Sequence, residues 1–148
     1  MPTRSELNDK IRRIIADEGL EAESHGEDGL KLYFGSSAVV IETHEIGEGD
    51  SKRIAIEMSA SLLSNVSITD ELCRYVALEG LYLWGALRVY RNFGAPTTGT
   101  LALYYVLLGD FLDPPELLTA LSMLALTADG EDDVLQKRFG GVRQRRDR

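Results

Sequence analysis

Residues 101–141, LALYYVLLGDFLDPPELLTALSMLALTADGEDDVLQKRFGG, predict a strand, a sharp junction and a long helix in direct succession. The junction contains Asp113, whose carboxylate can accept hydrogen bonds from the free amides of a first helical turn. Pro114 and Pro115 follow at positions where a missing amide hydrogen costs nothing. We therefore expect the helix to begin after Asp113, which acts as its structural cap.

The helix that follows carries its apolar residues at the three- and four-residue spacing of a buried stripe. It runs from Leu117 to the pair Gly140 and Gly141, which is a typical stop signal. Gly130 lowers the helical propensity of the middle. We expect a bend or a break near Asp129.

The elements before this stretch follow from hydrophobic spacing and from turn residues. Ser5 is the expected N-cap of the first helix, and the polar segment 21–29 is typical of a loop. In chain order we expect a helix ending at Gly19, strands at 30–34, 37–46 and 53–60, a helix capped by Ser67 or Thr69 and ended by Gly80 or Gly85, and strands at 86–92 and 100–108.

This order, α-β-β-β-α-β-β-α, predicts the α+β class with a mostly antiparallel sheet and with helices mainly on one face. We expect a single domain over residues 1–141, because a chain of 148 residues buries enough surface for one core. Residues 142–148 follow the glycine pair and are mostly basic, and we expect a flexible tail there.

The composition suits a cytoplasmic protein. The N-terminus lacks the apolar core of a signal peptide, and no run of about 18 apolar residues is present to span a membrane. Cys73 is the only cysteine, and we expect it to be buried on the apolar face of the second helix. The net charge of −8 repels phosphate backbones, so we expect no nucleic-acid partner.

No set of residues has the spacing of a catalytic, cofactor or metal site. His25 and His44 are the only histidines, and neither stands in a motif with Cys73. Zinc normally takes a set of Cys or His ligands that these three residues hardly supply without help from carboxylates. The carboxylates at 129–133 depart from the spacing of a calcium-binding loop and are typical of a solvated helix turn. We therefore expect neither an enzyme nor a bound cofactor.

The strand at 100–108 is apolar on both faces. Helices on one side of a sheet leave the other side uncovered, and an uncovered apolar face usually marks a partner. Tyrosines on such a face suit contact with protein, because they combine apolar area with a polar tip. The candidate partner or dimer surface comprises Tyr90, Ala102, Tyr104, Val106 and Leu108.

Four segments carry a family resemblance: SSAVVIETHEI (36–46), SITDELCRYVALEG (67–80), VLLGDFLDPPELLTALSMLALTAD (106–129) and DDVLQKRFGG (132–141). With these segments in this order, the chain resembles the bacterial YbjN family of type III secretion chaperone-like domains. The resemblance implies a compact, often dimeric α+β fold that binds segments of other proteins. It also implies that binding sometimes adds a strand to the sheet.

We therefore expect a non-enzymatic peptide-binding chaperone-like or adaptor module that acts as a homodimer and does not associate with membranes. The alternative is a small-molecule or ion-sensing regulatory domain that uses the 129–133 turn or a pocket between the sheet and the helices. In a third interpretation, the first helix and the tail cover the second apolar face within one subunit. That arrangement leaves no partner surface.

Overall fold

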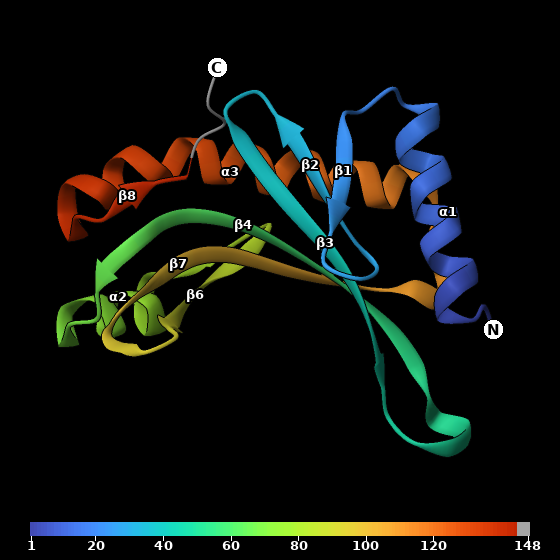
Figure 1. Cartoon of the computed structure of the whole chain (residues 1–148), viewed down its shortest axis with the longest axis horizontal. Coiled ribbons are helices and arrows are strands. Elements are labelled where there is room, and N and C mark those ends of the chain that lie inside the picture. The colour runs from blue at the N-terminus through green and yellow to red at the C-terminus, as the bar shows by residue number, and fades with distance from the viewer. Residues whose placement is uncertain (145–148) are drawn as a thin grey trace.

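The computed structural model describes residues 1–144, which form one eight-stranded antiparallel sheet and three α-helices (Figure 1). In chain order the elements are α1 (Arg4–Asp17), β1 (Ala22–His25), β2 (Gly29–Phe34), β3 (Ser37–Ile46), the 3-10 turn η1 (Gly49–Ser51), β4 (Arg53–Ser67), α2 (Asp70–Glu79), β5 (Leu81–Tyr82), β6 (Gly85–Asn92), β7 (Ala95–Leu108), the 3-10 turn η2 (Gly109–Phe111), α3 (Pro114–Phe139) and β8 (Val142–Arg143). The α+β class and the predicted order of the longer elements are confirmed. The short strands β1, β5 and β8 are additions to that order.

The sheet is built around two long neighbouring strands. Its order is β1-β2-β3-β4-β7-β6-β5, and every paired strand is antiparallel to its neighbour. β4 and β7 have 15 and 14 residues, whereas their outer neighbours β3 and β6 have 10 and 8. Figure 1 shows β4 and β7 running side by side through the middle of the molecule.

One face of the sheet packs against the helices and forms the core. Along β4, the buried side chains of Ile54, Ile56 and Met58 alternate with the less buried Glu57 and Ser59, as expected for a strand covered on one side. The helical residues in the same apolar cluster are Leu7, Ile11, Ile14 and Ile15 of α1, Leu72 of α2, and Leu117, Leu121, Leu124 and Leu135 of α3. The helices thus share one core on one face, and within residues 1–144 no helix lies over the opposite face of the sheet.

The first helix begins earlier than the sequence predicted. Thr3, not Ser5, is the N-cap, and its hydroxyl accepts from the Glu6 amide at 3.2 Å. The Glu6 carboxylate accepts in return from the Thr3 amide at 2.7 Å, and this hydrogen bond lowers the pKa of Glu6. Ser5 lies inside the first turn, because the reciprocal hydrogen bonds between Thr3 and Glu6 place the N-cap two residues before it. The expected loop at 21–29 also contains β1, whose backbone pairs with β2 despite its polar side chains.

The second helix is short, and this changes the environment of Cys73. Thr69 caps it by accepting from the Leu72 amide at 3.1 Å, and Gly80 follows its last residue. Leu72 is the one residue of α2 that is fully buried. Cys73 is exposed, so the expectation of a buried thiol was wrong. Because α2 has only 10 residues and lies at the edge of the core, it buries one narrow stripe of side chains, and Cys73 lies outside that stripe.

The third helix is continuous through Gly130. Asp113 occupies its N-cap position and accepts from the Glu116 amide at 2.8 Å, at the place that the sequence indicated. No break interrupts its 26 residues near Asp129, where the sequence led us to expect a bend or a break. Ala128 and Leu135 are buried on either side of the glycine, so packing holds both halves of the helix against the sheet. Among residues 1–144, no helix is both long and apolar enough to cross a membrane.

The chain does not leave the domain at the predicted boundary after Gly141. Val142 and Arg143 form β8, which pairs with Ser64 and Leu63 of β4. β3 stops pairing with β4 at Ser59, so this part of the β4 edge is available to another strand. The predicted flexible tail therefore starts as sheet, and residues 145–148 lie outside the described part of the chain.

Replacing Gly130 with Ala should stabilise the protein by about 0.5–1 kcal/mol, because glycine is unfavourable inside a helix. A Cβ at this position meets no atom within 4 Å. Urea unfolding of wild type and Gly130→Ala measures the difference. Gly109→Ala is the matched control and should be destabilising, since its Cβ would lie 2.3 Å from the side chain of Leu7. A loss of stability in Gly130→Ala would contradict a continuous helix.

Candidate functional site

The strand β7 is paired on both sides along most of its length and on one side only at its end. β6 reaches it as far as the Ala86–Tyr104 pair, whereas β4 continues to the Ala55–Leu108 pair. Within the described part of the chain, residues 105–108 therefore have a neighbouring strand on one side only. Alternate residues of a strand direct their N–H and C=O groups to opposite sides, so some of these groups face outward without a strand partner. We call residues 105–108 the open edge.

The side chains around the open edge are apolar and exposed. Val106 and Leu108 lie on the face without helices and are 40% and 51% exposed. Leu81 of β5 and Leu83 of the following turn are 83% and 88% exposed. Single exposed apolar residues are ordinary, but a group of them beside unpaired backbone is typical of a binding surface.

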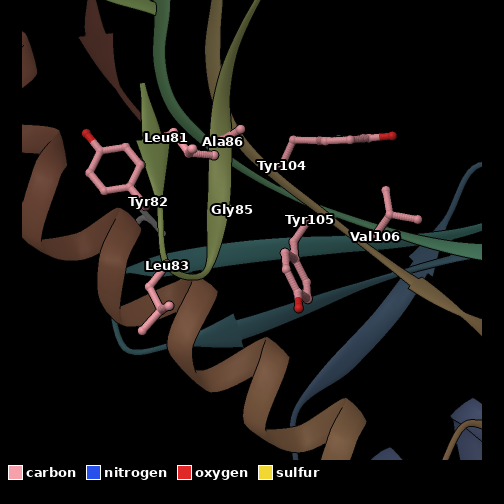
Figure 2. Close-up of a pocket in the computed structure, with 8 residues that line it drawn as sticks. All are labelled: Leu81, Tyr82, Leu83, Gly85, Ala86, Tyr104, Tyr105 and Val106. Atoms are coloured by element: carbon pink, nitrogen blue, oxygen red, sulfur yellow. The ribbon is translucent and has the colours of Figure 1, made fainter. Parts of the chain in front are cut away.

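A pocket of about 310 Å³ lies at the open edge (Figure 2). Figure 2 shows Tyr104 and Val106 on one side of β7 and Tyr105 on the other, so the pocket extends around the edge of the sheet. The Tyr105 ring packs against Trp84, with 5.9 Å between ring centres. The pocket is lined by Leu81, Tyr82, Leu83, Gly85, Ala86, Tyr104, Tyr105 and Val106.

Gly85 fixes the point at which β6 meets β7. Its φ of +124° is rarely adopted by other residues, and a Cβ there would lie 3.0 Å from the Tyr104 carbonyl oxygen. The two strands approach closely at this residue, and the chain before it turns away into β5. The open edge therefore begins at a defined position, immediately after Tyr104.

Tyr82 at the pocket and Tyr90 on the adjoining open face have raised pKa values. Burial raises the pKa of Tyr82, whose hydroxyl donates to Glu131 at 3.2 Å and so ties β5 to α3. Burial also raises the pKa of Tyr90, although the positive charge of Arg88 opposes this change. The Arg88 guanidinium lies 5.0 Å from the ring centre of Tyr90 and 4.6 Å from that of Tyr104. The open face beside the pocket thus presents tyrosine rings held by a shared cation.

The structure separates the five residues of the predicted partner surface. Tyr104 and Val106 line the pocket, and Leu108 is exposed on the same face. Tyr90 lies on β6, where 37% of its surface is exposed. Ala102 is only 3% exposed and offers little contact area. The accessible part of the predicted surface is therefore concentrated at the open edge.

Sequence reasoning missed the other wall of the pocket. The helical spacing of the apolar residues extends to Leu81 and Trp84, so the sequence leaves the end of the second helix open between Gly80 and Gly85. The structure places residues 81–84 in β5 and a turn instead. The available signal was the pair Gly80 and Gly85, since a glycine at each end of a short segment favours an independent turn.

The acidic turn at 129–133, considered above as an ion site, is divided among structural contacts. Asp129 accepts from the hydroxyls of Ser36 and Ser37 at 2.9 and 3.4 Å. Glu131 accepts from Tyr82, and Asp133 pairs with Arg143. These carboxylates face different neighbours, so they do not converge on a common point.

A pocket between the sheet and a helix is present, as the small-molecule alternative requires. It has a volume of about 460 Å³ and lies between the turn after β2 and the middle of α3. Asp129, at its rim, is engaged by the two serines already described. The other lining residues are Phe34, Gly35, Ser122, Ala125 and Leu126. The pocket offers an apolar wall and one carboxylate whose acceptor capacity is partly used.

Potential metal ligands meet at one place among residues 1–144. Glu42, His44 and Glu57 each provide a ligand atom, and these atoms lie within 4.8 Å of one another. All three residues lie on the sheet face that has no helix over it. Sequence reasoning expected no metal site, because the register that brings β3 beside β4 is not visible in the spacing of the residues.

Comparison with known proteins supports the fold and leaves the activity open. The chain matches no known family model and no curated protein sequence. Its structure is similar to the crystal structure of YbjN from E. coli, described as a putative transcription regulator, with a TM-score of 0.53 and 15% sequence identity. The likeness covers 84% of this chain and 92% of that one. The fold is YbjN-like. At this identity the likeness concerns the fold alone.

Amide hydrogen exchange should reveal the open edge directly. In the variant Val106→Glu, whose added charge opposes pairing of a second strand, the amides of residues 105–108 that face β4 should exchange slowly, and those that face outward should exchange quickly, because no neighbouring strand protects them. Residues 101–104, which are paired on both sides, should be slow throughout. Residue-resolved NMR exchange measures both groups. Equal protection of the two segments would show that the edge is covered.

Proposed function

We propose that this protein is a non-enzymatic adaptor that binds an extended segment of a partner protein along the open edge. The observation that supports the proposal is that the unpaired β7 backbone adjoins an apolar pocket, with Tyr105 and Val106 belonging to both. Strand addition to an exposed sheet edge is an established mode of peptide recognition. Main-chain hydrogen bonds supply affinity in this mode, and pockets for alternate side chains supply specificity.

The geometry of the open edge predicts which kind of segment binds there. An added strand lies about 4.8 Å from β7 and directs its side chains alternately to the two faces of the sheet. On the face without helices they meet Tyr104 and Val106, and on the other face they meet Tyr105 and Leu83. Residues 105–108 carry no charge. We therefore expect a short extended segment with apolar residues at successive positions.

We also propose that the free protein is a homodimer formed through the same edge. Two copies related by a two-fold axis can place their open edges antiparallel, and the interface is then self-complementary. No like charges oppose one another within Tyr-Val-Leu-Leu, residues 105–108. Because one edge cannot hold two strands, a bound peptide should replace the second copy.

A random-peptide phage library panned against the protein should enrich extended apolar segments. The enriched peptides should bind Val106→Glu at least about tenfold more weakly, because a charge on the edge must then be desolvated. Leu78→Glu is the matched control: it places the same charge on α2, at a side chain that is 73% exposed. Isothermal titration measures the affinities. If no peptide is enriched, or if Val106→Glu binds as Leu78→Glu does, the edge is not the binding site.

Light scattering after size exclusion should give twice the mass of the chain for wild type and for Leu78→Glu. Val106→Glu should give the mass of one chain, and circular dichroism should show that it remains folded. Saturation of wild type with an enriched peptide should also shift the mass toward one chain plus peptide. A dimer that persists in Val106→Glu would place the self-association surface elsewhere.

A further inference from the structure

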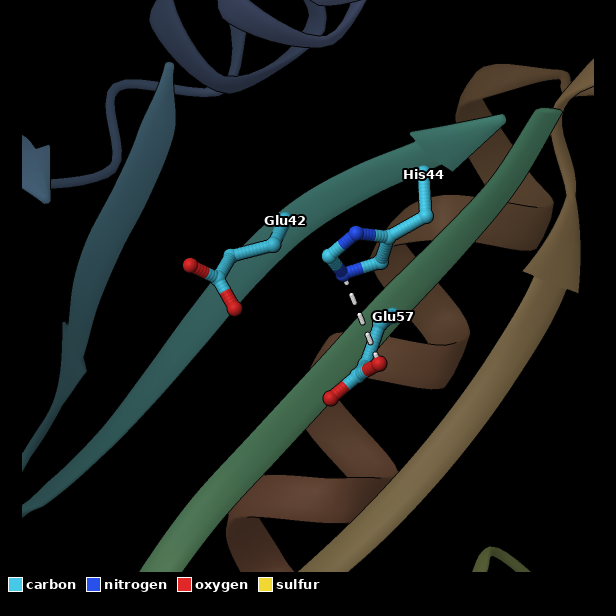
Figure 3. Close-up of side chains that lie close together, drawn as sticks. All are labelled: Glu42, His44 and Glu57. Carbon is cyan, nitrogen blue, oxygen red and sulfur yellow. Dashed lines mark ion pairs between the residues drawn. The ribbon is translucent and has the colours of Figure 1, made fainter. Parts of the chain in front are cut away.

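Three potential ligands stand together on the open face of the central strands. Glu42 and His44 are two residues apart on β3, and Glu57 lies on β4 directly opposite Glu42 (Figure 3). The imidazole Nε2 of His44 is 3.5 Å from a carboxylate oxygen of Glu57. Adjacent residues Thr43 and Ile56 are buried on the core side, so alternation places these three side chains on the other face.

The two carboxylates form a like-charge pair, and within residues 1–144 no lysine or arginine forms an ion pair with either of them. Like charges directly opposite each other on a sheet are destabilising. The nearest basic residues along the two strands are engaged elsewhere: Lys52 pairs with Glu45 at 2.7 Å, and the Arg53 guanidinium contacts Asp110 at 3.1 Å. Within residues 1–144 the half-buried Glu42 carboxylate has neither an ion pair nor a hydrogen bond.

The negative charge also reaches the neighbouring strands. Burial is the main cause that raises the pKa of Tyr90, and the positive charge of Arg88 opposes it. The charges of Glu57 and Glu42 act in the same direction as burial. A cation placed between Glu42 and Glu57 would relieve both the mutual repulsion and this field.

We propose that Glu42, His44 and Glu57 bind a divalent first-row transition-metal ion, with zinc as the ion to test first. Imidazole nitrogen together with carboxylate oxygen suits zinc and its neighbours, whereas calcium requires six to eight oxygen ligands. Ligands of a tetrahedral zinc ion lie roughly 3.3–3.6 Å apart, given metal–ligand distances of about 2.0–2.2 Å. The separations here are up to 4.8 Å, so rotation of the flexible glutamate side chains completes the site.

The surroundings leave the ion accessible. The His44 and Glu57 side chains are 49% and 26% exposed, so the ion enters from solvent without opening the fold. Three protein ligands leave a fourth tetrahedral position for water or for a side chain of a partner. Glu57 is directly opposite Val106 of the open edge, so the ion would be next to the proposed peptide site without being part of it.

Zinc titration of tag-free protein, stripped with a chelator and desalted, tests the proposal. Calorimetry should show one equivalent bound, and zinc should raise the melting temperature. His44→Gln and Glu57→Gln should each weaken binding at least about tenfold, in line with the effects of disturbing a metal site. His25→Gln, on the exposed strand β1, is the matched control and should bind as wild type does.

Glu42→Gln separates metal binding from damage to the fold. Without metal it should raise the melting temperature, because one of two opposed charges is removed. With zinc it should lose most of the increase that wild type shows. The proposal is overturned if stripped wild type binds no zinc, or if His44→Gln, Glu57→Gln and Glu42→Gln keep wild-type affinity. It is equally overturned if His25→Gln is the variant that loses binding.

Discussion

The pairing of β4 with β7 is the contact on which the rest of the structure depends. These two strands are longer than the strands on either side of them, so neither β3 nor β6 can cover them completely. On the β4 side the uncovered part is taken by β8, which returns from the end of α3. On the β7 side no described strand takes the corresponding place. The open edge is thus a consequence of strand length.

Because the helices cover one face of the sheet, the other face is available to bind a partner or an ion. The core side is filled by branched apolar residues, and this packing makes the sheet a fixed platform. The open face is mixed: tyrosines and Arg88 lie over β6 and β7, whereas Glu42, His44 and Glu57 lie over β3 and β4. Rigid strands hold both groups at set spacings, which is what recognition of a partner or an ion requires.

The sequence is informative wherever local chemistry decides the structure. Asp113 before two prolines marks the start of α3, and the alternation along 53–60 marks a strand covered on one side. It is less informative where a distant partner decides. The polar strand β1 exists because β2 offers it backbone hydrogen bonds, and α3 passes through Gly130 because the core holds it. For the site, composition indicated the apolar second face of β7. The open edge and the Glu42–Glu57 pair both depend on register, which spacing along one chain does not contain.

The open edge also bears on how copies of this protein behave when crowded. Sheet edges are commonly protected by lysine, proline or a bulge, and residues 105–108 contain neither of those residue types. What opposes indiscriminate stacking here is the net charge of −8, which makes copies repel one another over about 10 Å at moderate ionic strength. Concentrated salt shortens that range. Protection against aggregation therefore depends on the ionic strength of the solvent and on how much of the time a strand occupies the edge.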